Sequence, residues 1–161
     1  MAKLTAMQIR SATPADAPEL TQLAHVSKRH WGYPEHWIEA WRDDLTFTPA
    51  FVADHEVFIV HIGGAPAACY ALSAPPAEEA KALELQHFWL DPSHIGEGLG
   101  RKLFEHAVAE ARSRHASALW IDSDPHAEPF YTHMGAVRMG ATRADIDGVR
   151  RELPRMRFVV E

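Results

Sequence analysis

Apolar and polar positions alternate along several short stretches of this chain of 161 residues, which is the pattern of half-buried β-strands. Residues 7–10 favour a short first strand. The stretches 57–62 and 67–73, joined by Gly-Gly-Ala-Pro, predict a β-hairpin. Residues 81–90 predict a further strand, in which the alternation slips near His87 and so indicates a β-bulge.

A helical spacing of apolar residues marks the first part of the chain. Thr13 before Pro14 is a helix-start signal, and the spacing predicts a helix that runs to about His30. After a turn at residues 32–34, a second helix is predicted whose apolar face carries Trp37, Ile38, Trp41 and Leu45.

The second half of the chain changes period at Leu99. An apolar stripe predicts a helix from Leu99 to near His115, followed by a short buried strand over 118–122. A compact helix then ends at Gly135, a typical C-terminal stop signal. Two final strands are predicted on either side of the Ile-Asp-Gly turn, within residues 137–145 and 150–160.

This order of elements predicts a mixed sheet in one domain over residues 1–161. The helix that starts at Leu99 connects the strand over 81–90 to the strand over 118–122, so these two strands should be parallel. Counted together, the elements give about seven strands, mostly antiparallel, and four helices. The fold class expected is therefore α+β, with one parallel crossover.

Composition and net charge limit the class of protein and the kinds of binding partner to expect. Hydrophobic residues make up 47% and charged residues 24%, which is ordinary for a soluble globular protein. A formal net charge of −6 argues against nucleic acid or an anionic membrane as the main partner. The N-terminal residues lack the apolar core of a signal peptide, and Cys69 is the only cysteine, so we expect a cytoplasmic protein without a disulfide.

The stretch Ile95-Gly-Glu-Gly-Leu-Gly-Arg-Lys102 is the strongest candidate for chemistry. A dinucleotide fingerprint would need a third glycine where Arg101 stands, and the Walker A spacing is absent. A plain tight turn is the structural alternative. Three glycines directly before a helix, with Arg101 and Lys102 in its first turn, favour an anion site such as a phosphate site.

The residues around this loop resemble the GNAT N-acetyltransferase family over residues 8–160. Its acetyl-CoA loop has an Arg/Gln-x-x-Gly-x-Gly/Ala core, and Gly98 and Gly100 match the two glycines. Its second signature, Asn-x-x-Ala-x-x-Phe-Tyr followed by Gly, is matched by Ala127, Phe130 and Tyr131, with Gly135 after them. Ile95 replaces the usual Arg or Gln, and Asp124 replaces the usual Asn, where we expect it to cap a helix.

The resemblance implies a GNAT fold and direct transfer of an acetyl group from acetyl-CoA to the amine of a small molecule, without a metal. It implies that the backbone at the end of the strand over 81–90 pairs with the pantetheine amides and that the loop holds the pyrophosphate. The implied cofactor residues are Trp89, Leu90, Ile95, Gly96, Glu97, Gly98, Leu99, Gly100, Arg101, Lys102, Asp124, Ala127 and Phe130.

Acetyl transfer needs a base for the attacking ammonium and an acid for the departing thiolate. The resemblance makes Tyr131 the candidate acid, and its alternative is a packed tyrosine with a bonded hydroxyl. Glu84 is the candidate base, with an ordinary strand carboxylate as the alternative, and His87 is the second candidate. Cys69 is expected to be a small core residue.

The acceptor cannot be identified from the sequence. Trp31 and Tyr33 lie on the turn between the first two helices, which wall the acceptor site in the family, so they are candidate substrate residues together with His87. The eleven histidines are scattered and lack metal-site spacing, so no metal is expected. Two alternative functions are a non-catalytic acyl-CoA-binding module and a structural partner protein that uses the aromatic residues Trp31, Tyr33, Trp37 and Trp41 as an interface. A homodimer is left open.

Ile95 provides a test of the loop. If main-chain N–H groups carry most of the pyrophosphate binding, Ile95→Arg should tighten CoA binding only modestly, as measured by calorimetry with wild-type protein as the reference. A large gain in affinity would contradict backbone-dominated binding and would mean that the chain has drifted from efficient acetyl-CoA use.

Overall fold

The computed structural model describes residues 6–161, which form two compact units. Unit 1 takes in the described residues up to Ala71 together with His87–Leu103, and unit 2 takes in Leu72–Gln86 and Phe104–Glu161. Seven strands form one sheet, in the order β1-β2-β3-β4-β5-β7-β6. The mixed α/β fold class predicted from the sequence is confirmed by this sheet.

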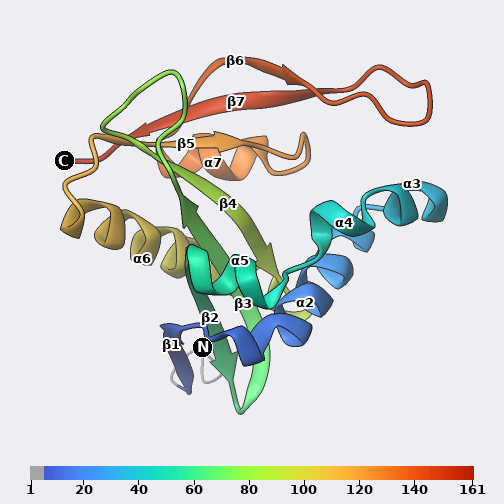
Figure 1. Cartoon of the computed structure of the whole chain (residues 1–161), viewed down its shortest axis with the longest axis horizontal. Helices are drawn as coiled ribbons and strands as arrows, with labels where there is room; N and C mark the ends of the chain where they lie inside the picture. The colour runs from blue at the N-terminus through green and yellow to red at the C-terminus, as the bar shows by residue number, and fades with distance from the viewer. Residues whose placement is uncertain (1–5) are drawn as a thin grey trace. The chain divides into compact units, whose positions relative to one another are not determined.

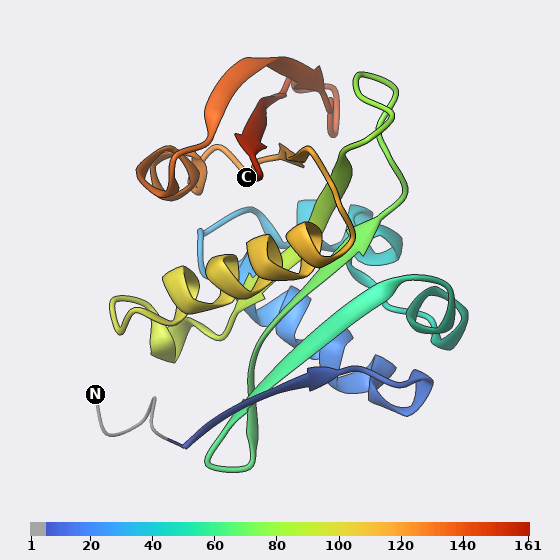
Figure 2. The same ribbon diagram turned by 90° about the vertical axis from the view of Figure 1, so that its left-hand side faces the viewer.

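The first strands of unit 1 follow the predicted pattern. β1 (Met7–Ser11) pairs antiparallel with β2 (Glu56–Ile62), and Figure 2 shows the two side by side. β3 (Ala65–Ser73) follows β2 through Gly63 and Gly64, which both have positive φ. Such backbone geometry at two successive residues is the turn that a two-residue hairpin requires.

Helices of unit 1 cover a single apolar cluster. The 3₁₀ turn η1 (Pro14–Asp16) leads into α2 (Ala17–Arg29), which buries Leu20, Leu23 and Ala24. These side chains pack with Ile38, Leu45, Phe47, Val52, Val57, Ile59, Cys69 and Ala71. Cys69 is fully buried, as expected for a small core residue.

Two helical predictions in unit 1 were wrong. The single helix predicted after Pro34 is two short helices, α3 (Glu35–Ala40) and α4 (Arg42–Leu45), because Trp41 between them leaves helical geometry at φ −87° and ψ 2°. The apolar spacing continues across Trp41, so the sequence pattern did not indicate that the helix is interrupted there. The sequence analysis also missed α5 (Pro49–Asp54), although Thr48 caps it as a Thr-Pro start signal would indicate.

β4 (Leu83–Leu90) and α6 (Leu99–Ser113) each contribute residues to both units. The 3₁₀ turn η2 (Pro92–His94) lies between them, and β5 (Ala118–Asp122) follows α6. β4 and β5 pair in parallel at Leu83 with Leu119 and at Glu84 with Trp120. The predicted crossover is therefore confirmed.

The end of the chain forms the rest of unit 2. After α7 (Glu128–Met134), β6 (Val137–Arg143) and β7 (Glu152–Val159) run antiparallel to each other, as Figure 1 shows, and β7 also pairs antiparallel with β5. The described residues contain six α-helices rather than the four predicted, because α5 was missed and the helix after Pro34 is two helices.

Gly135 ends α7 in the left-handed conformation, with φ 111°. A Cβ at this position would lie 3.4 Å from the Phe158 ring. The contact is an ordinary van der Waals distance, so it is the backbone conformation that favours glycine.

Gly135→Ala should lower the free energy of unfolding by about 1–2 kcal/mol, because alanine rarely adopts this backbone geometry. Urea denaturation measures the change. Gly140→Ala is the matched control, since a Cβ at Gly140 meets nothing within 4 Å and its φ is not in the left-handed region. Equal destabilisation by both changes would contradict this account of Gly135.

Candidate functional site

The glycine loop lies in unit 1 and turns the chain from β4 into α6. Asp91 caps η2, with its Oδ1 accepting from the Ser93 backbone N–H at 3.0 Å and the Ser93 hydroxyl at 2.7 Å. Gly96 and Gly98 both have φ of 84°, a conformation that side-chain-bearing residues avoid. The two glycines thus let the loop turn sharply into the helix.

The first turn of α6 presents its N–H groups at this loop. The Gly98 carbonyl accepts the first helical bond, from the Lys102 N–H at 3.2 Å. The N–H groups of Leu99 and Gly100 belong to the first turn, where an α-helix supplies no carbonyl of its own. Arg101 and Lys102 are exposed, while Leu99 is buried and anchors the helix. Positive charge and backbone donors coincide here, which suits an anion.

The side chains of Ile95 and Glu97 in the loop have different surroundings. Ile95 is 50% exposed, so the residue that stands at the usual Arg or Gln position presents an apolar side chain to solvent. Glu97 turns back to His94, whose Nδ1 lies 3.1 Å from its Oε2. The Glu97 carboxylate therefore helps to fix the loop next to η2.

His87 departs from strand geometry at the position where the sequence predicts a bulge. It has φ of 54°, a left-handed conformation unusual for a residue with a side chain. Its ring lies 4.3 Å from the Phe47 ring, between centroids, and its Nδ1 accepts a hydrogen bond from Trp89 Nε1 at 3.2 Å. Burial, with a smaller effect of nearby His55, lowers the pKa of His87 to about 4.

Aromatic rings gather at the corner between α2 and α3 in unit 1. The Tyr33 ring stacks on Trp37 at 6.0 Å and meets Trp41 edge-on at 5.1 Å. The Lys28 ammonium lies over the Trp41 ring at 4.5 Å from its centroid. Trp31 is 38% exposed and packs against the His30 ring. Tyr33 is thus half-buried within an aromatic cluster, and Trp31, two residues earlier in the chain, is exposed.

Tyr131 lies in unit 2, on the buried face of α7, and is only 5% exposed. Its ring packs against Phe130 at 5.2 Å and Phe104 at 6.1 Å, between centroids. Burial, and then the negative charge of Asp124, raise the pKa of Tyr131 above its usual value. The phenol therefore stays protonated through the neutral range.

The expected capping role of Asp124 needs a correction. The N-cap of α7 is Ala127, not Asp124. Asp124 instead closes the turn before the helix, where its Oδ1 accepts from the His126 backbone N–H at 2.8 Å, and its Oδ2 lies 3.7 Å from the Arg151 guanidinium. The helix therefore has its N-cap three residues later than the Asp-Pro pair at Asp124 and Pro125 predicted.

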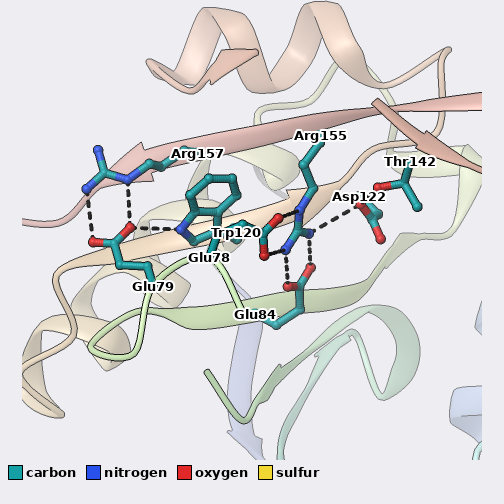
Figure 3. Close-up of polar contacts among 8 residues, drawn as sticks. All are labelled: Glu78, Glu79, Glu84, Trp120, Asp122, Thr142, Arg155 and Arg157. Atoms are coloured by element: carbon teal, nitrogen blue, oxygen red, sulfur yellow. Dashed lines mark hydrogen bonds and ion pairs between the residues drawn. The ribbon is translucent and has the colours of Figure 1, made fainter. Parts of the chain in front are cut away.

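Glu84 lies on β4 in unit 2, where it belongs to a network of ion pairs (Figure 3). Arg155 on β7 donates to both of its carboxylate oxygens, at 2.7 Å and 2.9 Å. Burial raises the pKa of Glu84, and the hydrogen bonds and charge of Arg155 oppose this rise. The candidate base is thus a paired carboxylate rather than an isolated one.

Sequence reasoning did not find Arg155. The signal was present in Arg155-Met156-Arg157, where two arginines on one face of a strand flank a fully buried methionine. What the sequence could not supply was the partner, since Arg155 and Glu84 are 71 residues apart.

Among residues 6–161, no group of three or more His, Cys, Asp or Glu side chains is placed to hold a metal ion. Within the same described range, no helix is both long and apolar enough to cross a membrane.

The fold is a mixed sheet with one parallel crossover, and a glycine loop precedes the crossover helix. The model of the acetyltransferase (GNAT) family matches residues 18–136, well over half of the chain. The chain therefore belongs to this family and is a GNAT-type acetyltransferase.

Solved structures show the same fold over most of the chain. A GCN5-related N-acetyltransferase from Rhodopseudomonas palustris aligns with a TM-score of 0.74 and 22% identity, over 94% of each chain. The PaiA N-acetyltransferase from Thermoplasma acidophilum, solved with coenzyme A, aligns with a TM-score of 0.72 and 17% identity, over 95% of this chain and 98% of that one. YncA of Salmonella typhimurium, solved with acetyl-CoA, aligns with a TM-score of 0.68 and 19% identity, over 96% and 94%. A comparison with curated proteins gives no match.

The depressed pKa of His87 predicts a pH dependence of stability. Between pH 6.5, the ordinary His value, and about 4, the unfolded chain binds a proton here that the folded chain does not. The free energy of unfolding should therefore fall as pH falls through this window, with a contribution from His87 on the order of 2–3 kcal/mol.

Urea denaturation at several pH values, compared with His87→Asn, measures this contribution. Asparagine tolerates the left-handed backbone but does not titrate, so the variant should lose part of the slope. The matched control is His115→Asn, because His115 also has positive φ, at 58°, but is exposed. A slope unchanged by His87→Asn would contradict a buried neutral histidine.

Proposed function

We propose that this protein transfers the acetyl group of acetyl-CoA directly to the amine of a small-molecule acceptor. The observation that carries the proposal is the glycine loop, where Gly96 and Gly98 take left-handed backbone geometry directly before α6. In this family such a loop is where the pyrophosphate of CoA is expected, and the PaiA and YncA structures were solved with CoA and acetyl-CoA.

The cofactor would be held mainly by the main chain. Main-chain N–H groups from Gly98 to Gly100 would bind the pyrophosphate, with charge from the Arg101 and Lys102 side chains. The backbone of Trp89 and Leu90 would pair with the pantetheine amides, in the manner of an added strand. Ile95 offers no hydrogen-bond donor from its side chain, so the affinity would rest on the backbone.

The reaction adds an amine to the thioester carbonyl and then expels the CoA thiolate. The C–N bond forms as the carbonyl oxygen takes up negative charge, and the C–S bond breaks as that charge returns. Tyr131 would donate its phenolic proton to the departing sulfur, and it would regain a proton, directly or through water, from the adduct nitrogen, which loses its second N–H proton as the amide forms. The raised pKa of Tyr131 keeps the phenol protonated at the pH where an amine is acetylated. It also makes the phenol a weaker acid, so the transfer would depend on the negative charge that develops on the sulfur.

The acceptor ammonium must first lose a proton, and Glu84 is the base that we favour. Each carboxylate oxygen has two acceptor sites, so the two bonds from Arg155 leave capacity for the acceptor or for a water molecule. His87 is the weaker candidate, because its pKa is about 4 and its Nδ1 already accepts from Trp89.

The acceptor is proposed to be a small molecule whose apolar part contacts the aromatic corner. Trp31 and Tyr33 would line the pocket, since Trp31 is exposed and Tyr33 stands at the turn between α2 and α3. Rings such as these supply contact area and can also attract a cation.

A non-catalytic acyl-CoA-binding module is the alternative, which the exposed Ile95 favours. The two functions differ in one measurement. An enzyme releases free thiol from acetyl-CoA only when a suitable amine is present, whereas a binding module shows a thermal shift with CoA and no acceptor-dependent release.

The test is a thiol-release screen of amines with acetyl-CoA, followed by the Tyr131→Phe variant on any amine that reacts. The variant should lose roughly 10²-fold or more in kcat with little change in the KM for acetyl-CoA, because only the acid is removed. Tyr70→Phe is the control, since Tyr70 is also buried but lies in β3 outside the proposed site.

Two results would count against the proposal. Thermal stabilisation by CoA without thiol release for any amine would favour the binding module. An undiminished kcat in Tyr131→Phe would remove Tyr131 as the acid while leaving the acetyltransferase reaction in place.

A further inference from the structure

The Glu84 carboxylate lies at a defined point of the sheet in unit 2. Glu84 pairs with Trp120 in the parallel register of β4 and β5, and Trp120 pairs with Arg157 of β7 in the antiparallel register. Two residues further along β5, Asp122 pairs with Arg155. Because side chains two residues apart share a face of a sheet, all of these groups project to the same side, as Figure 3 shows.

Arg155 crosses β5 to reach Glu84. Its guanidinium carbon lies over the Trp120 ring, 5.1 Å from the centroid, and its Nη1 and Nη2 donate to Glu84 Oε2 and Oε1 at 2.7 Å and 2.9 Å. Two parallel N–H···O bonds of this kind fix both the position and the plane of a carboxylate. The Glu84 side chain therefore has a single orientation as long as Arg155 is in place.

Further carboxylates hold the guanidinium itself. Glu78 accepts from Nε at 2.9 Å and from Nη2 at 3.1 Å, and Asp122 Oδ1 accepts from Nη1 at 3.2 Å. Asp122 Oδ1 is fixed in turn by the Thr142 hydroxyl at 2.8 Å. Arg155 is thus clamped from the connector before β4, from β5 and from β4, and its side chain is only 12% exposed.

The balance of charge explains why an arginine is needed here. The groups that face Glu84 are Arg155 from β7, Asp122 from β5 and Glu78 from the connector, so one cation meets three carboxylates. Burial and the two neighbouring acids favour a protonated Glu84, and Arg155 alone among these groups favours the ionised form. Removing Arg155 would leave three carboxylates together without a cation.

We propose that Arg155 is a positioning residue for acetyl transfer, which keeps Glu84 ionised and oriented so that it can take the proton of the acceptor ammonium. This inference rests on the proposed function, in which Glu84 is the base. The proton moves from the ammonium to a Glu84 oxygen, which leaves a neutral amine to attack, and Arg155 stays protonated throughout. Glu84 then returns the proton to water.

The matched pair of variants is Arg155→Gln and Arg157→Gln. Both remove an arginine from the same face of β7, but Arg157 pairs with Glu79, at 2.8 Å, and not with Glu84. In Arg155→Gln, the acidic limb of the pH profile of kcat should move upward by about one pH unit or more, with the KM for acetyl-CoA unchanged. Arg157→Gln should keep the wild-type limb.

A second readout does not depend on activity. In protein labelled with ¹³C at glutamate carboxyls, and assigned with Glu84→Gln, the titration of Glu84 should move to higher pH in Arg155→Gln and stay in place in Arg157→Gln. If the wild type acetylates no amine, the proposed function fails, and this titration still tests the link between Arg155 and Glu84. An unmoved titration overturns the inference even in an active enzyme.

Arg155→Lys covers the case in which Arg155→Gln does not fold. Lysine keeps the charge but loses the planar fork, so the acidic limb should stay near its wild-type position while kcat falls about tenfold. A wild-type kcat in Arg155→Lys would overturn the inference that the guanidinium orients Glu84. An upward shift of the acidic limb in a folded Arg155→Lys would overturn the inference that the positive charge keeps Glu84 ionised.

Discussion

The parallel pairing of β4 with β5 is the constraint on which the rest of this structure depends. Parallel neighbours cannot be joined by a tight turn, so the chain must cross over, and α6 is that crossover. The crossover needs a sharp entry into the helix, which Gly96 and Gly98 provide with left-handed backbone geometry. The same entry directs the first N–H groups of α6 at the loop, so one topological requirement creates the backbone of an anion site.

Within unit 2, a second constraint is electrostatic. A partly buried carboxylate on a central strand is costly unless a cation accompanies it, and Glu84 has Arg155 as its partner. Arg155 also ties the connector before β4 to the sheet through Glu78, and the neighbouring pair of Glu79 and Arg157 does the same. The polar face of this part of the sheet is therefore ordered by ion pairs, whereas unit 1 is ordered by an apolar cluster.

Local signals made much of the fold predictable. The hairpin at Gly63-Gly64, the strand over 118–122 and the end of α7 at Gly135 were all found from spacing and turn residues. Predictions failed where geometry changes without a change of pattern, as at Trp41, or where a segment is too short for periodicity, as in α5. The roles predicted for Tyr131, Glu84 and the loop residues stay predictions, to which the structure adds burial and partners.

The sequence by itself determined the order of the elements, the glycine loop and the family, because these depend on local backbone preference and on short motifs. The tertiary structure decided which charges meet. Arg155 and Glu84 come together only because β7 pairs with β5 and β5 with β4, and a spacing of 71 residues contains no trace of that pairing. The surroundings that lower the pKa of His87 and raise that of Tyr131 are likewise products of packing, since burial is the larger cause in both cases.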